Sequence, residues 1–226
     1  MATFTCIADA MKIRRFPICT WIAATITVIA GLCLSTGSPS AAQDPVILAF
    51  GDSLTAGFGV EPEQAFPARL EAYLRAKGVA VRVRNGGVSG DTTAGGRARL
   101  DWALADKPRF AIVELGANDA LRAIDPKVAE DNLDAILSAL DAHGVKVLLA
   151  GMVAPPNLGR DYDQAFDGMY ARLAARHHVM LYPFFLDGVA ADPALNQPDG
   201  MHPNPKGVEI IVERMAPYVE KLVRGE

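Results

Sequence analysis

The sequence predicts one α/β domain, a three-layer α/β/α sandwich around a five-stranded, mainly parallel sheet. The first observation is size and composition: of 226 residues, 50% are hydrophobic and 21% are charged, which allows one sizeable core and excludes a disordered or fibrous chain. The second is an alternation of short β-rich segments with segments of helical period, as in βαβ units. The third is that no internal repeat or long linker follows residue 45.

The expected strands are short runs rich in β-branched and other aliphatic residues. They comprise residues 46–50, 79–83, 110–115, 145–150 and 179–182. Right-handed crossovers between parallel strands place the intervening helices on both faces of the sheet. In such sheets, ligands bind beyond the carboxyl ends of the strands. We therefore expect the chemistry of this protein to lie directly after one or more strands.

Three of the expected helices carry clear end signals. The helix after the first strand closes at Gly78, because glycine readily takes the left-handed conformation that ends a helix. The second begins at Asp125-Pro126, an N-cap followed by a proline at the first helical position, and ends at Gly144. The last, near the C-terminus, contains Pro217, and we expect it to bend there.

The N-terminal segment, residues 1–42, has the three parts of a secretory signal peptide. Basic side chains at residues 12–15 precede an apolar run at residues 18–34, and small residues follow. We expect cleavage of this leader, with Met11 as an alternative start, and a single folded domain at residues 43–226. The competing interpretation is an uncleaved anchor that spans the membrane once.

Charge and cysteine positions bear on compartment and partners. The formal net charge of −4 argues against nucleic acid, since phosphate binding normally requires a basic face. Cys6, Cys19 and Cys33 all lie in the leader, so the domain contains no thiol and is compatible with an oxidising compartment. We expect an exported, periplasmic protein with no stable membrane span once the leader is removed, and nothing in the sequence predicts its oligomeric state.

Glycine-rich polar loops follow three of the expected strands. Gly-Asp-Ser-Leu lies at 51–54, Ser-Gly-Asp-Thr at 89–92 and Gly-Ala-Asn-Asp at 116–119, and Asp-Gly-Met-His lies near the C-terminus at 199–202. Carboxyl ends of parallel strands share one edge of a sheet, which would bring the first three loops together. This is the edge at which a site is expected.

These loops contain the residue types of a serine hydrolase. Ser53 needs a base to become a nucleophile, and His202 needs an orienting acid to be that base. Asp199 lies three residues before His202, a spacing that lets a turn bring its carboxylate to Nδ1 and leaves Nε2 for Ser53. The N–H groups of Ser53 and Gly90 and the side-chain amide of Asn118 can hold an oxyanion. We therefore expect three catalytic residues and three oxyanion donors.

The same blocks resemble the SGNH, or GDSL, hydrolases over essentially all of residues 45–224. The residues that match the family's four named positions, in order, are Ser53, Gly90, Asn118 and His202. The blocks are most similar to the bacterial thioesterase, lysophospholipase and arylesterase branch, and residues 152–157 resemble its substrate loop. The sequence departs mildly from the family's pattern at Ala117, a position where a second glycine is frequent in the family. The resemblance implies the flavodoxin-like SGNH fold, no metal or organic cofactor, and export in many members.

Together these observations predict an exported esterase that acts on a small-molecule ester or lipid through an acyl-serine intermediate. Short aryl and acyl esters, acyl thioesters and lysophospholipids are the expected substrates, with Ala56, Phe58, Val60 and residues 152–158 as the apolar acyl site. Two alternatives remain: an esterase for acetylated sugars, and a catalytically silent protein that binds lipid or glycan on the same scaffold.

Other polar and aromatic residues receive structural interpretations. We expect Asp52 and Asp119 to cap or brace the loops, and Trp102 to pack a helix against the sheet. The adjacent His177 and His178 point in different directions on any regular backbone, which suits a shared metal ion poorly. The sequence therefore predicts no metal site.

Overall fold

The computed structural model describes residues 44–226, in which a five-stranded, wholly parallel sheet has the strand order β2-β1-β3-β4-β5. The strands are β1 Val46–Gly51, β2 Arg82–Gly87, β3 Phe110–Glu114, β4 Lys146–Ala150 and β5 Met180–Tyr182. The central strands β1 and β3 are almost wholly buried, as strands covered on both faces must be. The expected leader, with Cys6, Cys19 and Cys33, lies outside the described residues.

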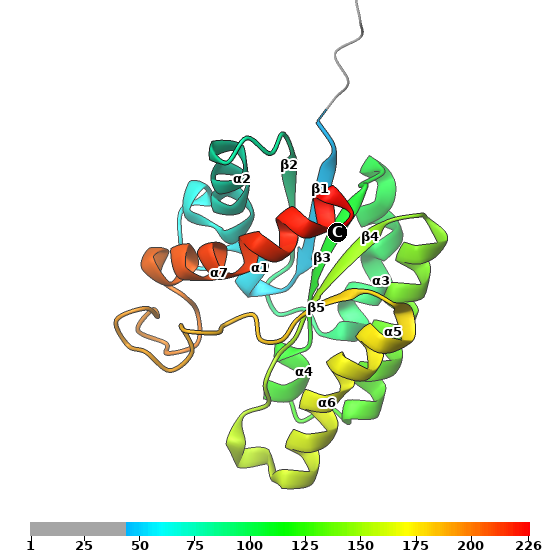
Figure 1. Ribbon diagram of the computed structural model, residues 1–226. Helices are drawn as coiled ribbons and strands as arrows, with labels where there is room; N and C mark the ends of the chain where they lie inside the picture. Colours follow the sequence, from blue (N-terminus) through cyan, green and yellow to red (C-terminus); the bar gives the residue numbers. More distant parts are fainter. Residues whose placement is uncertain (1–43) are drawn as a thin grey trace, which may run out of the picture. The chain divides into compact units, whose positions relative to one another are not determined.

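Helices cover both faces of the sheet, so the predicted three-layer α/β/α fold is confirmed (Figure 1). The helices are α1 Ser53–Ala56, α2 Phe66–Ala76, α3 Thr93–Ala103, α4 Ala117–Leu121, α5 Pro126–Ala142, α6 Arg160–His177 and α7 Pro205–Arg224. Helix α2 packs with α7 on one face, while α3, α5 and α6 pack side by side on the other. No helix within residues 44–226 is both long and apolar enough to cross a membrane.

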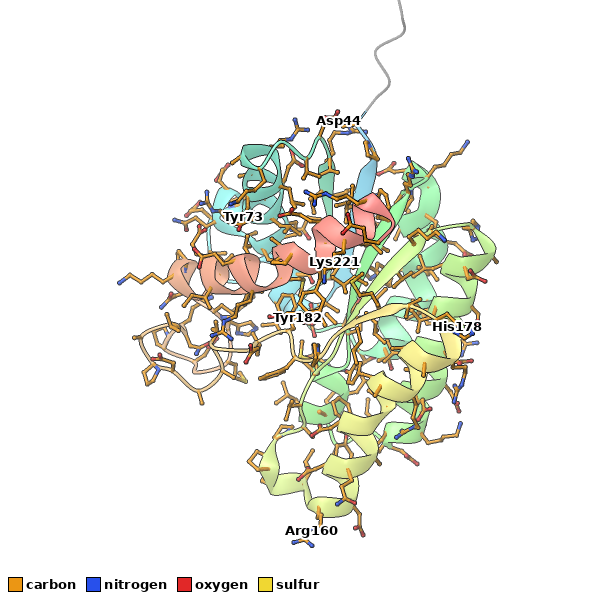
Figure 2. All side chains as sticks on the ribbon, viewed as in Figure 1. Asp44, Tyr73, Arg160, His178, Tyr182 and Lys221 are labelled. Atoms are coloured by element: carbon orange, nitrogen blue, oxygen red, sulfur yellow. The ribbon has the colours of Figure 1, made fainter. Side chains whose placement is uncertain are left out.

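Most helix ends follow the expected signals. Gly78 and Gly144 take positive φ angles of 79° and 70° after α2 and α5, and the carboxylate of Asp125 accepts a hydrogen bond from the N–H of Lys127. Helix α7 continues past Pro217 and ends at Arg224. The face of α7 that meets the sheet includes Tyr218, whose ring packs edge-on against Tyr182, labelled in Figure 2.

The expected second strand, residues 79–83, is placed wrongly by the sequence pattern. Val79 lies in the turn that follows α2, where its N–H donates to the carbonyl of Leu74, and β2 runs instead over Arg82–Gly87. This strand lies at the edge of the sheet, so it needs no continuous apolar run. Its position is determined by pairing with β1, in which Val46 lies beside Arg82.

Trp102 was expected to pack α3 against the sheet, and that expectation is wrong. Its side chain is 70% exposed, and the Arg84 guanidinium lies 5.9 Å from the ring centroid. Leu100 and Ala103 make the buried face of α3 instead. Because a helix turns about 100° per residue, position 102 lies away from the face that contains position 100.

The loops at the carboxyl end of the sheet and one long connection position the candidate site. Strand β5 is followed by a loop, coloured gold to orange in Figure 1, that leads to the start of α7. Helix α7 begins immediately after this loop, with Asn204 as its N-cap accepting from the N–H groups of Lys206 and Gly207. The cap fixes the chain direction directly after residues 199–202.

Candidate active site

Ser53 lies at the start of α1, directly beyond the carboxyl end of β1. Asp52 caps this short helix, since its Oδ1 accepts from the N–H of Leu54 at 3.0 Å, and the Asp52 side chain is fully buried. A side chain at Gly51 would collide with Thr55 and Glu114, so the turn requires glycine there. The expected bracing role of Asp52 is confirmed, and the turn presents the Ser53 hydroxyl at the edge of the sheet.

Ser53, His202 and Asp199 form a continuous series of hydrogen bonds. The Nε2 atom of His202 lies 2.9 Å from Ser53 Oγ, and Nδ1 lies 2.7 Å from Asp199 Oδ2. A carboxylate at Nδ1 holds the proton on that nitrogen, which leaves Nε2 free to accept from the serine hydroxyl. Ser53 and His202 lie 149 residues apart in sequence. This geometry suits proton transfer from Ser53 to His202.

Asp199 is held in its charged form and in one orientation. Its Oδ1 accepts from the N–H of His202 at 3.0 Å and from the N–H of Met201 at 2.9 Å. These two bonds, followed by the bond to the His202 ring, lower the pKa of Asp199 to about 2. The anionic carboxylate can therefore stabilise a positive imidazole across the neutral pH range.

The candidate oxyanion donors line the same cavity as the serine. This cavity has a volume of about 500 Å³, and its polar walls include Ser53, Gly90, Asn118 and His202. The Nδ2 atom of Asn118 donates to Asp52 Oδ2 at 3.1 Å and to the carbonyl of Asp91 at 3.0 Å. Both amide protons are thus partnered inside the protein, so an oxyanion would have to replace or share one of these bonds.

A second carboxyl group, Glu114, lies beneath the nucleophile turn and was not identified from the sequence. Its Oε2 accepts from the Thr55 hydroxyl at 2.7 Å and from the N–H of Asp52 at 3.3 Å, and its side chain is fully buried. Burial, and then the charge of Asp52, raise the pKa of Glu114 well above its ordinary value. The sequence feature that could have identified Glu114 is a single acidic residue in the otherwise apolar run at 110–115.

Asp52 and Glu114 share this buried environment but differ in their donors. Burial raises the pKa of Asp52 to about 6, while the Leu54 N–H and the Asn118 amide oppose the increase. Each carboxyl accepts two hydrogen bonds, but both of those to Glu114 reach Oε2, and its Oε1 has no hydrogen-bond partner among the described residues. Burial and the nearby charge of Asp52 therefore favour the neutral form of Glu114, and its donors favour the ionised form of Asp52.

The loops beyond β1, β2 and β3 are joined by further polar contacts. Asp119 accepts from both the N–H and the hydroxyl of Thr93, at 2.8 and 2.6 Å, which confirms its expected bracing role. Arg99 of α3 pairs with Asp91 at 2.5 Å and donates to the carbonyl of Gly51 at 2.9 Å. These contacts hold the loops of the predicted constellation at one edge of the sheet.

The remaining walls of the cavity are apolar. They include Leu54, Phe58, Ala120, Leu121, Met152, Val153, Pro155, Phe184, Leu186 and Met201. Phe58 and Met152 occupy the places expected of an acyl site, but Ala56 and Val60 do not, since both line a separate groove against α2 and β2. Side chains that follow a short helix point to different sides, and composition alone could not separate them. No three potential metal-ligating side chains gather within residues 44–226.

The comparisons with known proteins agree with this geometry. Residues 49–210 match the GDSL-like Lipase/Acylhydrolase family. The chain belongs to this family. It is therefore a hydrolase of carboxylic esters, and the predicted resemblance to SGNH hydrolases is confirmed.

Three relatives of this GDSL-family hydrolase span most of its domain. An arylesterase of Vibrio mimicus is 37% identical, over 87% of this chain and 97% of its own length. The thioesterase 1/protease 1/lysophospholipase L1 of Escherichia coli strain K12 is 39% identical, over 82% of this chain and 88% of its own. The crystal structure of AlinE4, an SGNH-hydrolase family esterase, has a TM-score of 0.68 and 49% identity, covering 79% of this chain and 96% of its own.

Proposed function

We propose that this GDSL-family hydrolase is an exported serine esterase that cleaves its substrates through a covalent acyl-Ser53 intermediate. The observation that carries the proposal is the hydrogen-bonded series Asp199–His202–Ser53, with its 2.7 and 2.9 Å distances. A serine hydroxyl on a neutral imidazole that is itself held by an anionic carboxylate has the arrangement of an activated nucleophile.

In the proposed reaction, Ser53 Oγ attacks the ester carbonyl carbon while His202 Nε2 takes its proton. The oxyanion accepts hydrogen bonds from the N–H groups of Ser53 and Gly90 and from the Asn118 amide, and Asp199 stabilises the imidazolium. His202 then donates its proton to the leaving alcohol or thiol, and the carbonyl re-forms as acyl-Ser53. Water attacks this ester with His202 as base, which releases the acid and restores the serine hydroxyl.

The proposed substrates are esters and thioesters with an apolar acyl chain. The apolar walls of the cavity, among them Leu54, Phe58 and Met152, support an acyl group, and the Ser53 hydroxyl lies at one wall. The names of the relatives, an arylesterase and a thioesterase and lysophospholipase, point in the same direction. Short aryl esters, acyl thioesters and lysophospholipids are therefore the first substrates to examine.

Replacement of the nucleophile tests the mechanism. We expect Ser53→Ala to lower kcat for p-nitrophenyl butyrate by more than about 10⁴-fold, because the covalent route is lost. The same variant should resist labelling by a fluorophosphonate, which reacts with activated serines. Ser138→Ala, an exposed serine on α5, is the matched control and should behave as the parent. Hydrolysis at the parental rate by Ser53→Ala would refute the assignment.

Export is proposed from the leader and is tested separately. We expect the protein recovered outside the cytoplasm to begin after residue 42, as the small-residue end of the leader indicates. N-terminal sequencing of protein secreted to the periplasm measures this directly. A chain that still begins at Met1 or Met11 and sediments with membranes would favour the uncleaved anchor.

A further inference from the structure

One side chain joins the loop of Asp199 and His202 to the segment that follows the nucleophile. The Nε2 atom of Gln197 donates to the carbonyl of Phe58 at 2.7 Å and to the carbonyl of Pro203 at 3.0 Å. Phe58 lies five residues after Ser53, and Pro203 directly follows His202. A single amide thus connects the backbone near the nucleophile with the backbone next to the imidazole.

The backbone of Gln197 makes two hydrogen bonds within the same loop. Its N–H donates to the carbonyl of His202 at 2.7 Å, and its carbonyl accepts from the N–H of Gly200 at 2.9 Å. The side chain fits closely against the nucleophile segment, because a Cβ atom at Gly59 would collide with it. Gly59 also has a φ of 74°, a conformation that suits glycine.

The amide group is chemically matched to this position. It offers two N–H donors, and both face backbone carbonyl oxygens, which accept but never donate. A glutamate of the same shape would have no donor and would place a carboxylate against two carbonyl oxygens. Retention of both bonds therefore requires an amide or another group with two donors at this reach.

We propose that Gln197 is a positioning residue for the esterase reaction, holding His202 at hydrogen-bond distance from Ser53. This inference rests on the proposed function of those two residues. Without the amide bridge, the segment with Phe58 and the loop with His202 can separate, and the 2.9 Å contact between Nε2 and Oγ lengthens. The Phe58 ring also packs against the imidazole, with 4.6 Å between ring centroids, so its displacement removes a second support.

The position of Gln197 separates this role from substrate binding. Asn196 and Gly200 of the same loop line the cavity, whereas Gln197 is not one of its lining residues and its amide meets the two carbonyls. A residue that orients the base without touching substrate should affect kcat and leave KM nearly unchanged. A residue that only stabilises the fold should change the free energy of unfolding but not the turnover of each folded molecule.

The test compares Gln197→Glu and Gln197→Met with Gln164→Glu, an exposed position on α6 that receives the same new charge. We expect both Gln197 variants to lower kcat for p-nitrophenyl butyrate by about 10- to 100-fold, because a shift of about 1 Å can cost about 10²-fold. KM should stay within about twofold, and the rate constant for fluorophosphonate labelling should fall in parallel with kcat. Gln164→Glu should match the parent.

Rates are expressed per folded molecule, with the folded fraction measured by circular dichroism and gel filtration. Parental kcat in the folded fraction of either Gln197 variant would overturn the proposal, and so would complete loss of folding in both, which would assign the residue to stability alone. Ser53→Ala is measured beside them. If that variant remained active, the proposed function itself would fail; if it is inactive while the Gln197 variants are normal, only the positioning role fails.

Discussion

At the scale of single residues, Asn118 combines two tasks. Its amide donates to Asp52 and to the Asp91 carbonyl, and the same group faces the cavity where an oxyanion would form. We expect Asn118→Ala to lower kcat/KM for p-nitrophenyl butyrate by about 10²- to 10³-fold, equivalent to about 2.7–4 kcal/mol of barrier, as for loss of another oxyanion donor. Steady-state kinetics with Asn118→Ala and the parent measure this.

The Asn118 prediction has a clear contrary outcome. A loss of less than about threefold would mean that the two internal bonds persist during the reaction and that backbone N–H groups hold the oxyanion alone. Gln164→Ala, which removes an exposed side-chain amide of α6 outside the cavity walls, serves as the control for a general loss of an amide.

The sequence predicts some of these residues better than others for a physical reason. Asp199 and His202 are close in the chain, and a turn suffices to make their contact predictable. Ser53 follows a strand, where the topology of a parallel sheet determines which edge it occupies. Gln197 and Glu114 act through contacts with backbone or buried atoms far away in sequence, and no local pattern encodes such contacts. Such contacts form only when the chain is folded.

At the scale of secondary-structure elements, Glu114 connects the end of β3 to α1. The folded protein holds the proton of this carboxyl to higher pH than the unfolded chain, because burial raises its pKa well above 4.5. Folding therefore takes up a proton, and the contribution of Glu114 makes the free energy of unfolding fall as pH rises above about 4.5. Asp52 adds to this decline between its ordinary value of 3.8 and about 6.

We expect Glu114→Gln to flatten this decline. The glutamine oxygen can still accept from Thr55 and Asp52, and its NH₂ group occupies the place of Oε1, which has no partner in the described chain. Urea unfolding from about pH 5 to about pH 8 measures the free energy at each pH. The exposed Glu63→Gln should keep the parental slope. A Glu114→Gln slope equal to that of the parent would show that Glu114 is ionised when folded.

The elements themselves illustrate what local patterns encode. Helix ends at Gly78, Asp125 and Gly144 were predictable because caps depend on a few neighbouring residues. The expected position of the edge strand β2 was wrong because that position depends on pairing with β1, which the sequence of β2 does not reveal by itself. Trp102 was misassigned for a related reason, since the face of α3 that becomes buried is determined by its partners α5 and β1.

At the scale of the whole molecule, the sheet order explains why distant segments form one site. Placing β1 between β2 and β3 brings the loops after all three strands to one edge. The long loop after β5 then returns across the sheet before α7 begins, and adds Asp199 and His202 (Figure 1). Arg160 at the start of α6 and Asp44 lie at opposite ends of the molecule (Figure 2). Ser53 and His202 therefore come within 2.9 Å of each other only in the folded chain.

The cavity predicts how activity depends on acyl chain length. Burial of each methylene contributes about 0.8 kcal/mol, so kcat/KM for p-nitrophenyl esters should rise about fourfold per CH₂ from acetate until the apolar walls are covered. Leu121, a cavity residue that is 56% exposed, should support the outer part of a long chain. Leu121→Asn should lower kcat/KM for octanoate about fivefold and leave acetate unchanged. Trp102, which is 70% exposed and lies outside the cavity, is the control, and Trp102→Asn should leave the whole profile unchanged. If Trp102→Asn lowers octanoate hydrolysis equally, general surface hydrophobicity controls the preference.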